Sequence, residues 1–394
     1  MLFKDSVKIS RTKVLEKRAQ SSWMDTMTLN PAIMEKDGII HMLFRATGTF
    51  VSKHQKSPDE FPICLGYGKS RDGGENWEFN FKRPALVPSL KYEKEDMYII
   101  NKYGERKINY ANGCIEDPRL FMLEDKCYMT AACRMFPPGA YWVHDEPMQC
   151  APEWAREETG FGRASSENVT VTVLYEVDFE ALEKQDFSNA FSYITNLTNP
   201  EFGQNRDVIL FPEKMMIDGE MQYVMLERPV TPYLNPQMAE KKPSMVISAA
   251  KSLSDFADKD NKKTIFAVPE YEWEQDRIGA STPLVKLDGG RWLLCYHGKQ
   301  DDTYGYTQSF MILENRENTF PEIVFRSGEK FINVSEKWEM PQTFKTPCIF
   351  ATGMIKRGEK LLISYGAADE CVGVMTLELN DLLSYIENVR GQYF

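Results

Sequence analysis

Apolar residues along this chain come in short runs that alternate with turn-forming residues, and long stretches of helical period are few. The runs are rich in Val, Ile, Tyr, Phe and Met and are bounded by Gly, Asp and Asn, which is typical of β-strands joined by tight turns. Helical spacing is expected only near the two ends, at residues 7–18 and 379–386. The pattern therefore predicts an all-β protein with short terminal helical segments.

A two-part pattern recurs five times between these ends. One part is a turn followed by an apolar strand that ends in polar residues; the turns are Asp37-Gly38, Glu124-Asp125, Asp218-Gly219, Asp288-Gly289-Gly290 and Arg357-Gly358. The other part precedes each turn and carries a proline: Pro31, Pro118, Pro212, Pro283 and Pro347. A third apolar run follows in most units, so each unit predicts an antiparallel meander.

Five meanders in one chain predict a five-bladed β-propeller, in which radial repetition leaves few exposed sheet edges. The proline-bearing strand is expected to be innermost. A pair of β-sandwiches is the competing fold, but it would not require the same proline-and-turn pair five times. We expect residues 1–394 to form a single propeller domain. An aromatic insertion at about 135–165 is expected to be a lid over the channel or a contact in a homo-oligomer.

Composition narrows the classes of partner. The formal charge of -11 and the pI near 5.2 disfavour nucleic acid and anionic membranes, which require a basic face. A mean hydropathy of -0.44 and the lack of a long apolar run argue against a membrane span, and the polar N-terminus predicts a cytoplasmic protein. The eight cysteines form no Cys-x-x-Cys pair, so we expect reduced, buried thiols and no metal site.

A propeller brings equivalent strand positions around one axis, so polar residues of the repeated elements should converge. They are Asn30, Arg45, Glu116, Asp117, Arg119, Arg134, Glu213, Lys214, Glu227, Arg228, Thr282, His297 and Asp369. Paired carboxylates suit glycosidic cleavage, and clustered Arg, Lys and His suit a phosphate. Both occur together in a glycoside phosphorylase, where phosphate replaces the attacking water and one protein acid suffices.

Each candidate also has a structural interpretation. Residues 116–119 could form a surface turn, Arg45 and Arg134 could lie on the solvated rim, and His297 could be a core histidine. Because strand residues alternate, Asp117 is expected to face the channel beside Asn30, Lys214 and Thr282, and Glu116 to point away.

Several segments, in order and spacing, resemble glycoside hydrolase family 130, the β-mannoside phosphorylases and β-1,2-mannosidases. They are Asn30-Pro31-Ala32, Ile115-Glu116-Asp117-Pro118-Arg119, Val208-Ile209-Leu210-Phe211-Pro212-Glu213-Lys214, Glu227-Arg228-Pro229, Tyr296-His297-Gly298 and Tyr365-Gly366-Ala367-Ala368-Asp369. The resemblance covers roughly residues 25–385. It departs from the family pattern at 279–283 and at 344–348, where an acid that would contact sugar is missing.

The resemblance implies a five-bladed propeller and a role for each candidate. Asp117 would be the general acid of an inverting cleavage, with its proton passing through a hydroxyl of the mannosyl ring. The phosphate-binding positions would be Arg45, Arg134, Lys214 and His297, and those holding the mannosyl unit would be Asn30, Arg119 and Asp369.

Three hypotheses follow. The first is an inverting β-mannoside phosphorylase that acts on a small oligosaccharide with inorganic phosphate as co-substrate, without a cofactor, and gives mannose 1-phosphate. The second is a β-mannosidase, acting on β-1,2 linkages, in which Glu213 or Glu227 is the base for water. The third is a carbohydrate-binding propeller without turnover.

Overall fold

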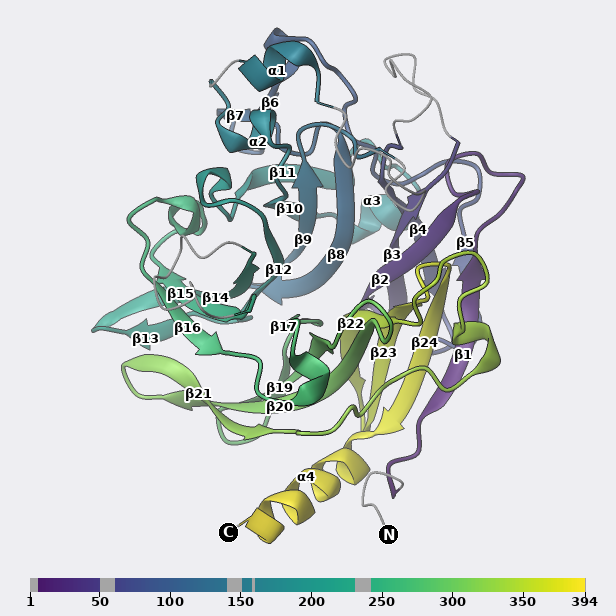
Figure 1. Ribbon diagram of the computed structural model, residues 1–394, viewed down its shortest axis with the longest axis vertical. Coiled ribbons are helices and arrows are strands. Elements are labelled where there is room, and N and C mark those ends of the chain that lie inside the picture. The colour runs from purple at the N-terminus through teal and green to yellow at the C-terminus, as the bar shows by residue number, and fades with distance from the viewer. Residues whose placement is uncertain (1–5, 50–60, 140–150, 158–159, 231–241, 394) are drawn as a thin grey trace.

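Five antiparallel sheets surround a common axis in the computed structural model, as the blades of a five-bladed β-propeller (Figure 1). The structure describes residues 6–49, 61–139, 151–157, 160–230 and 242–393. From the axis outward, the first blade is β2 (Met27–Lys36), β3 (Ile39–Thr47), β4 (Cys64–Ser70) and β5 (Glu78–Phe79), and the second is β8 (Cys114–Leu123), β9 (Lys126–Arg134), β10 (Val171–Val177) and β11 (Phe191–Asn196).

The third and fourth blades each carry an extra short strand beside their second strand. The third is β12 (Asn205–Leu210), β14 (Glu220–Pro229), β15 (Met245–Ala250) and β16 (Lys263–Ala267), with β13 (Met215–Ile217) on β14. The fourth is β17 (Arg277–Ala280), β19 (Arg291–Lys299), β20 (Tyr306–Arg316) and β21 (Thr319–Arg326), with β18 (Val285–Leu287) on β19. All five predicted turns lead into the second strand of a blade, as expected.

The N-terminal segment closes the ring. The fifth blade is β22 (Ile349–Arg357), β23 (Lys360–Ala367), β24 (Cys371–Glu378) and β1 (Ser10–Glu16), and Figure 1 shows β1 beside β24. The prediction of a helix over residues 7–18 is therefore wrong. The unpaired edge of β24 offers a ladder of hydrogen bonds, and this tertiary pairing overrides the weak helical preference of an isolated segment.

Helices are confined to connections and to the C-terminus. They are α1 (Glu153–Glu157), α2 (Arg163–Ser166), α3 (Phe179–Glu183) and the predicted C-terminal helix α4 (Leu379–Tyr393), with short 3-10 turns at η2 (Lys94–Asp96), η3 (Pro200–Phe202), η6 (Leu253–Ala257), η7 (Glu272–Glu274) and η8 (Lys337–Glu339). Within the described ranges, no helix is long and apolar enough to cross a membrane.

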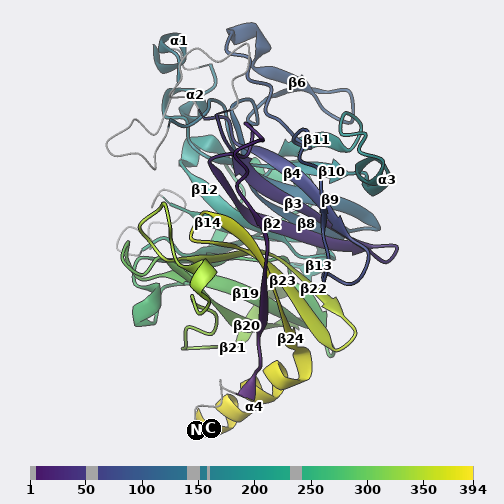
Figure 2. The same ribbon diagram turned by 90° about the vertical axis from the view of Figure 1, so that its right-hand side faces the viewer.

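The insertion extends from the second blade. Its helices α1 and α2, with the hairpin of β6 (Tyr98–Ile100) and β7 (Arg106–Ile108), lie at the end of the molecule opposite α4 in both views (Figure 2). Trp154 of α1 packs edge-on against Phe136 with ring centroids 5.8 Å apart. Residues 140–150 and 158–159 of the predicted insertion lie outside the described residues, so its role as lid or subunit contact stays a prediction.

Hydrophobic side chains fill the space between neighbouring blades. One cluster spans the first three blades and includes Leu43, Met129 and Val173; another joins the fourth and fifth blades through residues such as Phe310 and Ile363. The seven cysteines within the described residues are buried and unpaired, as predicted, and Cys150 lies outside that part of the chain. The packed blades form a rigid frame around the polar residues at the axis.

Candidate active site

The innermost strands of three blades share one irregularity. The pairing register shifts between Leu29 and Ala32 in β2, between Glu116 and Arg119 in β8, and between Arg206 and Ile209 in β12. Each shift contains one residue with positive φ: Asn30 at 45°, Asp117 at 53° and Asp207 at 59°. Left-handed backbone is uncommon outside glycine but is tolerated best by Asn and Asp, and bulges of this kind redirect side chains near active sites.

The residues at the bulges of β2 and β8, Asn30 and Asp117, contact each other. The Asn30 amide donates from Nδ2 to Asp117 Oδ1 at 2.8 Å, and the Arg45 guanidinium donates from Nη1 to the same oxygen at 3.0 Å. Arg206 Nη1 lies 3.8 Å from Asp117 Oδ2. Asp117 is thus held from three sides with its side chain 10% exposed, so a carboxyl group is fixed in position while it keeps access to solvent.

Glu116 faces the same cluster, and the expectation that it points away from Asp117 is wrong. Its carboxylate lies 3.0 Å from Arg45 Nη1, 3.0 Å from Arg206 Nη1 and 4.0 Å from Arg134 Nη2. The bulge explains the difference, because it interrupts the strict alternation of side chains along β8. Two consecutive acids therefore reach one group of arginines.

The arginines of this cluster determine the protonation state of Glu116. Burial alone would raise the pKa of Glu116, but Arg45, Arg206 and Arg134 outweigh burial and lower it to about 2. Glu116 is therefore ionised at neutral pH and cannot serve as a proton donor. Three guanidinium groups face Glu116 and Asp117, so positive charge is concentrated at this point of a chain whose net charge is -11.

Arg119 and His297 lie in a second cluster, around Asp207. Arg119 donates from Nη2 to Asp207 Oδ1 at 3.0 Å, from Nε to the Ser281 carbonyl at 2.7 Å and from Nη1 to the Asp117 carbonyl at 3.3 Å. His297 is fully buried, with Nε2 3.3 Å from Asp207 Oδ2. Burial lowers the pKa of His297 despite the neighbouring carboxylate. These contacts place Arg119 against the backbone of Asp117 and His297 beside Asp207.

Asp369 approaches the first cluster from the fifth blade. It follows β23 in a left-handed conformation with φ 58°, and Cys348 Sγ lies 3.8 Å from its Oδ1. Although its side chain is exposed, the protein atoms around it reduce its hydration and raise its pKa; Arg45 opposes this rise and the charge of Asp117 adds to it. Thr282, predicted beside Asp117, is buried next to Ser281, whose carbonyl accepts from Arg119.

Lys214 and Glu213 do not reach this site, and the prediction that Lys214 lies beside Asp117 is wrong. Lys214 Nζ pairs with Glu124 Oε1 at 2.9 Å, and Glu213 pairs with Lys286 at 2.6 Å. Glu124 follows Asp117 by seven residues of extended strand, roughly 20 Å of chain. The reason is that residues 211–214 form the turn after β12, whereas Asp207, without a proline, is the equivalent of Asn30 and Asp117.

Glu227 is also occupied elsewhere. Its carboxylate accepts from Asn205 Nδ2 at 2.7 Å and pairs with Lys263 Nζ at 2.7 Å, with a fully buried side chain. Neither proposed base for water is therefore beside Asp117.

Arg206 and Asp207 are the residues that the sequence reasoning missed. A signal was present: Arg206-Asp207-Val208-Ile209-Leu210 repeats the order of Glu116-Asp117-Pro118-Arg119-Leu120, with a charged pair ahead of an apolar run. This segment lacks the proline of the other elements, and Pro212 follows only after the end of β12.

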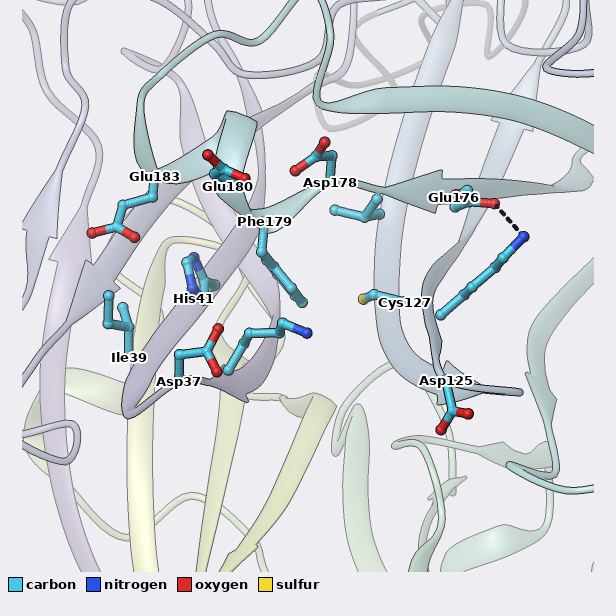
Figure 3. Close-up of a pocket in the computed structure, with 13 residues that line it drawn as sticks. Asp37, Ile39, His41, Asp125, Cys127, Glu176, Asp178, Phe179, Glu180 and Glu183 are labelled. Atoms are coloured by element: carbon cyan, nitrogen blue, oxygen red, sulfur yellow. Dashed lines mark ion pairs between the residues drawn. The ribbon is translucent and has the colours of Figure 1, made fainter.

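A cavity of about 510 Å³ lies between the first two blades, beside the turns that contain Asp37 and Asp125 (Figure 3). Asp37 and Asp125 line it beside the stacked rings of His41 and Phe179, whose centroids are 4.4 Å apart. Several of its carboxylates already have partners, such as Glu183 with Arg71 and Glu176 with Lys102. In the part of the chain that the structure describes, no group of three or more His, Cys, Asp or Glu is placed to hold a metal ion.

The fold and the site together define a five-bladed propeller whose inner strands hold a carboxyl group against an arginine cluster at the axis. The model of glycoside hydrolase family 130, described as beta-1,4-mannooligosaccharide phosphorylase, matches residues 161–388. The chain therefore belongs to this family of enzymes that act on β-mannosides, as the sequence motifs predicted.

Individual relatives are distant. A 1,2-beta-oligomannan phosphorylase of a Thermoanaerobacter species is 24% identical over 375 residues, which cover 95% of this chain and 98% of that protein. A beta-1,4-mannooligosaccharide phosphorylase of Ruminococcus albus is 27% identical over 333 residues, covering 82% and 76%. The fold is shared with the beta-1,2-mannobiose phosphorylase of Listeria innocua, whose structure superposes with a TM-score of 0.61 at 18% identity over 96% of this chain and 99% of that one.

Proposed function

We propose that this protein is an inverting phosphorylase that cleaves a terminal β-mannosyl linkage with inorganic phosphate and releases mannose 1-phosphate. The observation that carries the proposal is the position of Asp117 beside Arg45 and Arg206, with Arg134 joined to the same cluster through Glu116. An acid and an anion site are thereby combined at one point of the axis. Membership of family 130 and the phosphorylase names of the relatives support the same reaction.

In this reaction the arginine cluster binds phosphate through the planar forks of its guanidinium groups. A phosphate oxygen attacks the anomeric carbon from the face opposite the leaving group, so a carbon–oxygen bond to phosphate forms while the glycosidic bond breaks. The proton of Asp117 passes to the leaving oxygen through a hydroxyl of the mannosyl ring. Asn30 and Asp369 flank the acid and are proposed to hold that ring.

The surroundings of the cluster favour phosphate over water as the nucleophile. An inverting hydrolase needs a second carboxylate as base, with the two carboxyl groups about 6.5 to 9.5 Å apart. Glu213 and Glu227 are paired with lysines elsewhere, and Glu116 is held by arginines. Arg206, instead of the Lys214 expected from the sequence, is therefore proposed as a phosphate ligand.

The linkage is proposed to be β-1,2, because the 1,2-beta-oligomannan phosphorylase matches nearly the whole of both chains. A β-1,4 linkage is the alternative, given the Ruminococcus albus relative. The two departures from the family pattern, at residues 279–283 and 344–348, are proposed to affect the choice of acceptor sugar.

One assay tests both the reaction and the linkage. The protein is incubated with β-1,2- or β-1,4-mannobiose, with and without inorganic phosphate, and products are followed by ³¹P and ¹H NMR. We expect α-mannose 1-phosphate, the product of inversion, only when phosphate is present. Free mannose released at the same rate without phosphate would refute the proposal in favour of a β-mannosidase. Binding of both disaccharides without cleavage would leave a carbohydrate-binding propeller.

A further inference from the structure

Asp207 joins three blades through one carboxylate. Arg119 reaches it from the second blade at 3.0 Å, Arg228 donates from Nε within the third blade at 2.5 Å, and His297 approaches from the fourth blade at 3.3 Å. The side chains of Asp207, Arg119 and Arg228 are at most 3% exposed. A buried group with this many charged contacts is either a structural ion pair or a device that fixes neighbouring functional groups.

The charge of Asp207 is required by its neighbours. Burial alone would raise its pKa, but Arg228, His297 and Arg119 hold it well below its usual range, so Asp207 is ionised at neutral pH. Two buried guanidinium groups share this anion, and a guanidinium buried without a counter-charge is strongly destabilising. Loss of the charge would therefore force Arg119 or Arg228 to move or to find another partner.

Two short connections lead from Asp207 to the proposed reacting groups. The first passes through Arg119, which donates from Nη1 to the carbonyl of Asp117 at 3.3 Å. The second passes through the backbone, because Asp207 directly follows Arg206 at the bulge of β12. Arg206 in turn contacts Glu116 at 3.0 Å and Asp117 at 3.8 Å. Asp207 combines a left-handed backbone, with φ 59°, with these carboxylate contacts, and Arg206 is its direct neighbour in the chain.

We propose that Asp207 is a positioning residue for the phosphorylase site: its ionised carboxylate fixes Arg119 under the Asp117 backbone and orients Arg206 toward the place where phosphate binds. This inference rests on the proposed function. Asp207 itself touches neither substrate; it acts through the two arginines. At this point of the chain, the segment that resembles family 130 begins at Val208, so the resemblance assigns no role to Asp207.

The packing around Asp207 determines which substitution is informative. A Cβ atom added at Gly279 would lie 2.7 Å from Asp207 Oδ2 and 2.7 Å from the His297 ring, so the carboxylate sits tightly against the backbone of β17. A longer acid would not fit without moving β17. Asp207→Asn keeps the shape and removes the charge, and it is the variant of choice.

The experiment compares Asp207→Asn with wild-type enzyme on β-1,2-mannobiose and inorganic phosphate, with KM determined for each substrate. We expect the KM for phosphate to rise by about tenfold or more and kcat to fall, with a smaller change in the KM for mannobiose, because small misplacements of positioned groups are costly. Equal changes in both KM values, or unchanged kinetics in a folded variant, would overturn the proposal.

Two further variants separate positioning from general stability. Glu339→Gln removes a buried carboxylate that pairs with Arg11 at 2.8 Å at the outer edge of the fifth blade; it should lower the melting temperature but leave the ratio of the two KM values unchanged. If Asp207→Asn fails to fold, the double variant Asp207→Asn with Arg228→Met removes one charge of each sign. The proposal predicts that this double variant still has a raised KM for phosphate, and wild-type kinetics in it would refute positioning.

Failure of the proposed function has a different result. Wild-type enzyme that releases free mannose without phosphate disproves phosphorolysis but not the role of Asp207. In that case the same variants are compared by kcat/KM for hydrolysis, where Asp207→Asn should lose activity and Glu339→Gln should retain it.

Discussion

Replacing Glu116 by Gln tests whether the arginine cluster is stabilised by charge. The three arginines lower the pKa of Glu116 from 4.5 to about 2, and at 1.36 kcal/mol per pKa unit this shift corresponds to about 3 kcal/mol of folding free energy at pH 7. The group is 2% exposed, so solvent screening is small. Because the folded-state pKa is depressed, the contribution is complete above the unfolded pKa and is lost as pH falls toward the folded one. By the same linkage about 1 kcal/mol remains at pH 3.

The assay is urea unfolding of wild type and Glu116→Gln at pH 7 and pH 3, since urea does not screen charge. We expect Gln to cost about 3 kcal/mol at pH 7, and the difference from wild type to shrink to about 1 kcal/mol at pH 3. The matched control is Glu124→Gln on the same hairpin, whose carboxylate pairs with Lys214 while 53% exposed and should cost less than about 1 kcal/mol. A Glu116→Gln effect that stays the same at both pH values would refute the electrostatic reasoning.

Four other substitutions test the site and the frame. Asp117→Asn should lower kcat for mannobiose phosphorolysis by about 10² or more if Asp117 is the general acid; an unchanged kcat would leave it as a turn former. Arg206→Met should raise the KM for phosphate by about tenfold or more, because it removes a charge-assisted contact. Lys214→Met is the control and should change this KM little. Steady-state kinetics that showed the larger effect for Lys214→Met would contradict the assignment of Arg206 as a phosphate ligand. Arg11→Met breaks a buried pair with Glu339 and should cost about 3 kcal/mol or more in urea unfolding without changing KM, and a cost below about 1 kcal/mol would show that the pair is dispensable.

The fold was largely predictable from the sequence because the same local pattern, a tight turn followed by a short apolar strand, occurs five times. Turns such as Asp37-Gly38 and Asp218-Gly219 carry the positive φ that a tight hairpin needs, and the apolar runs that follow them are too short for core helices. The helix prediction for the N-terminal segment was wrong because the structure of this segment depends on a distant partner. Its pairing partner is β24, more than three hundred residues away, and no local pattern encodes that contact.

The site was predictable only in part, for reasons that depend on the bulges. Asp117, Arg45 and Asn30 were found because each stands in a repeated element. The pairing of Glu116 with Arg206 was not predicted. Neighbouring side chains of a regular strand point to opposite faces, so Glu116 and Asp117 were not expected to share partners, but a bulge interrupts this alternation. The third bulge lacks the proline that marks the other two, so Arg206 and Asp207 were assigned no role from the sequence.

The ring is closed by β1, and this has a consequence during synthesis. Ser10 pairs with Thr376, so at about 5 to 20 residues per second the ribosome needs roughly 20 to 70 s to make the partner after β1 has emerged. Throughout that time the strand with which β1 pairs in the folded protein is not yet present. Its sequence, Ser10-Arg11-Thr12-Lys13-Val14-Leu15-Glu16, has only two apolar residues. That composition suits a segment that must remain free of other chains until β24 has been synthesised.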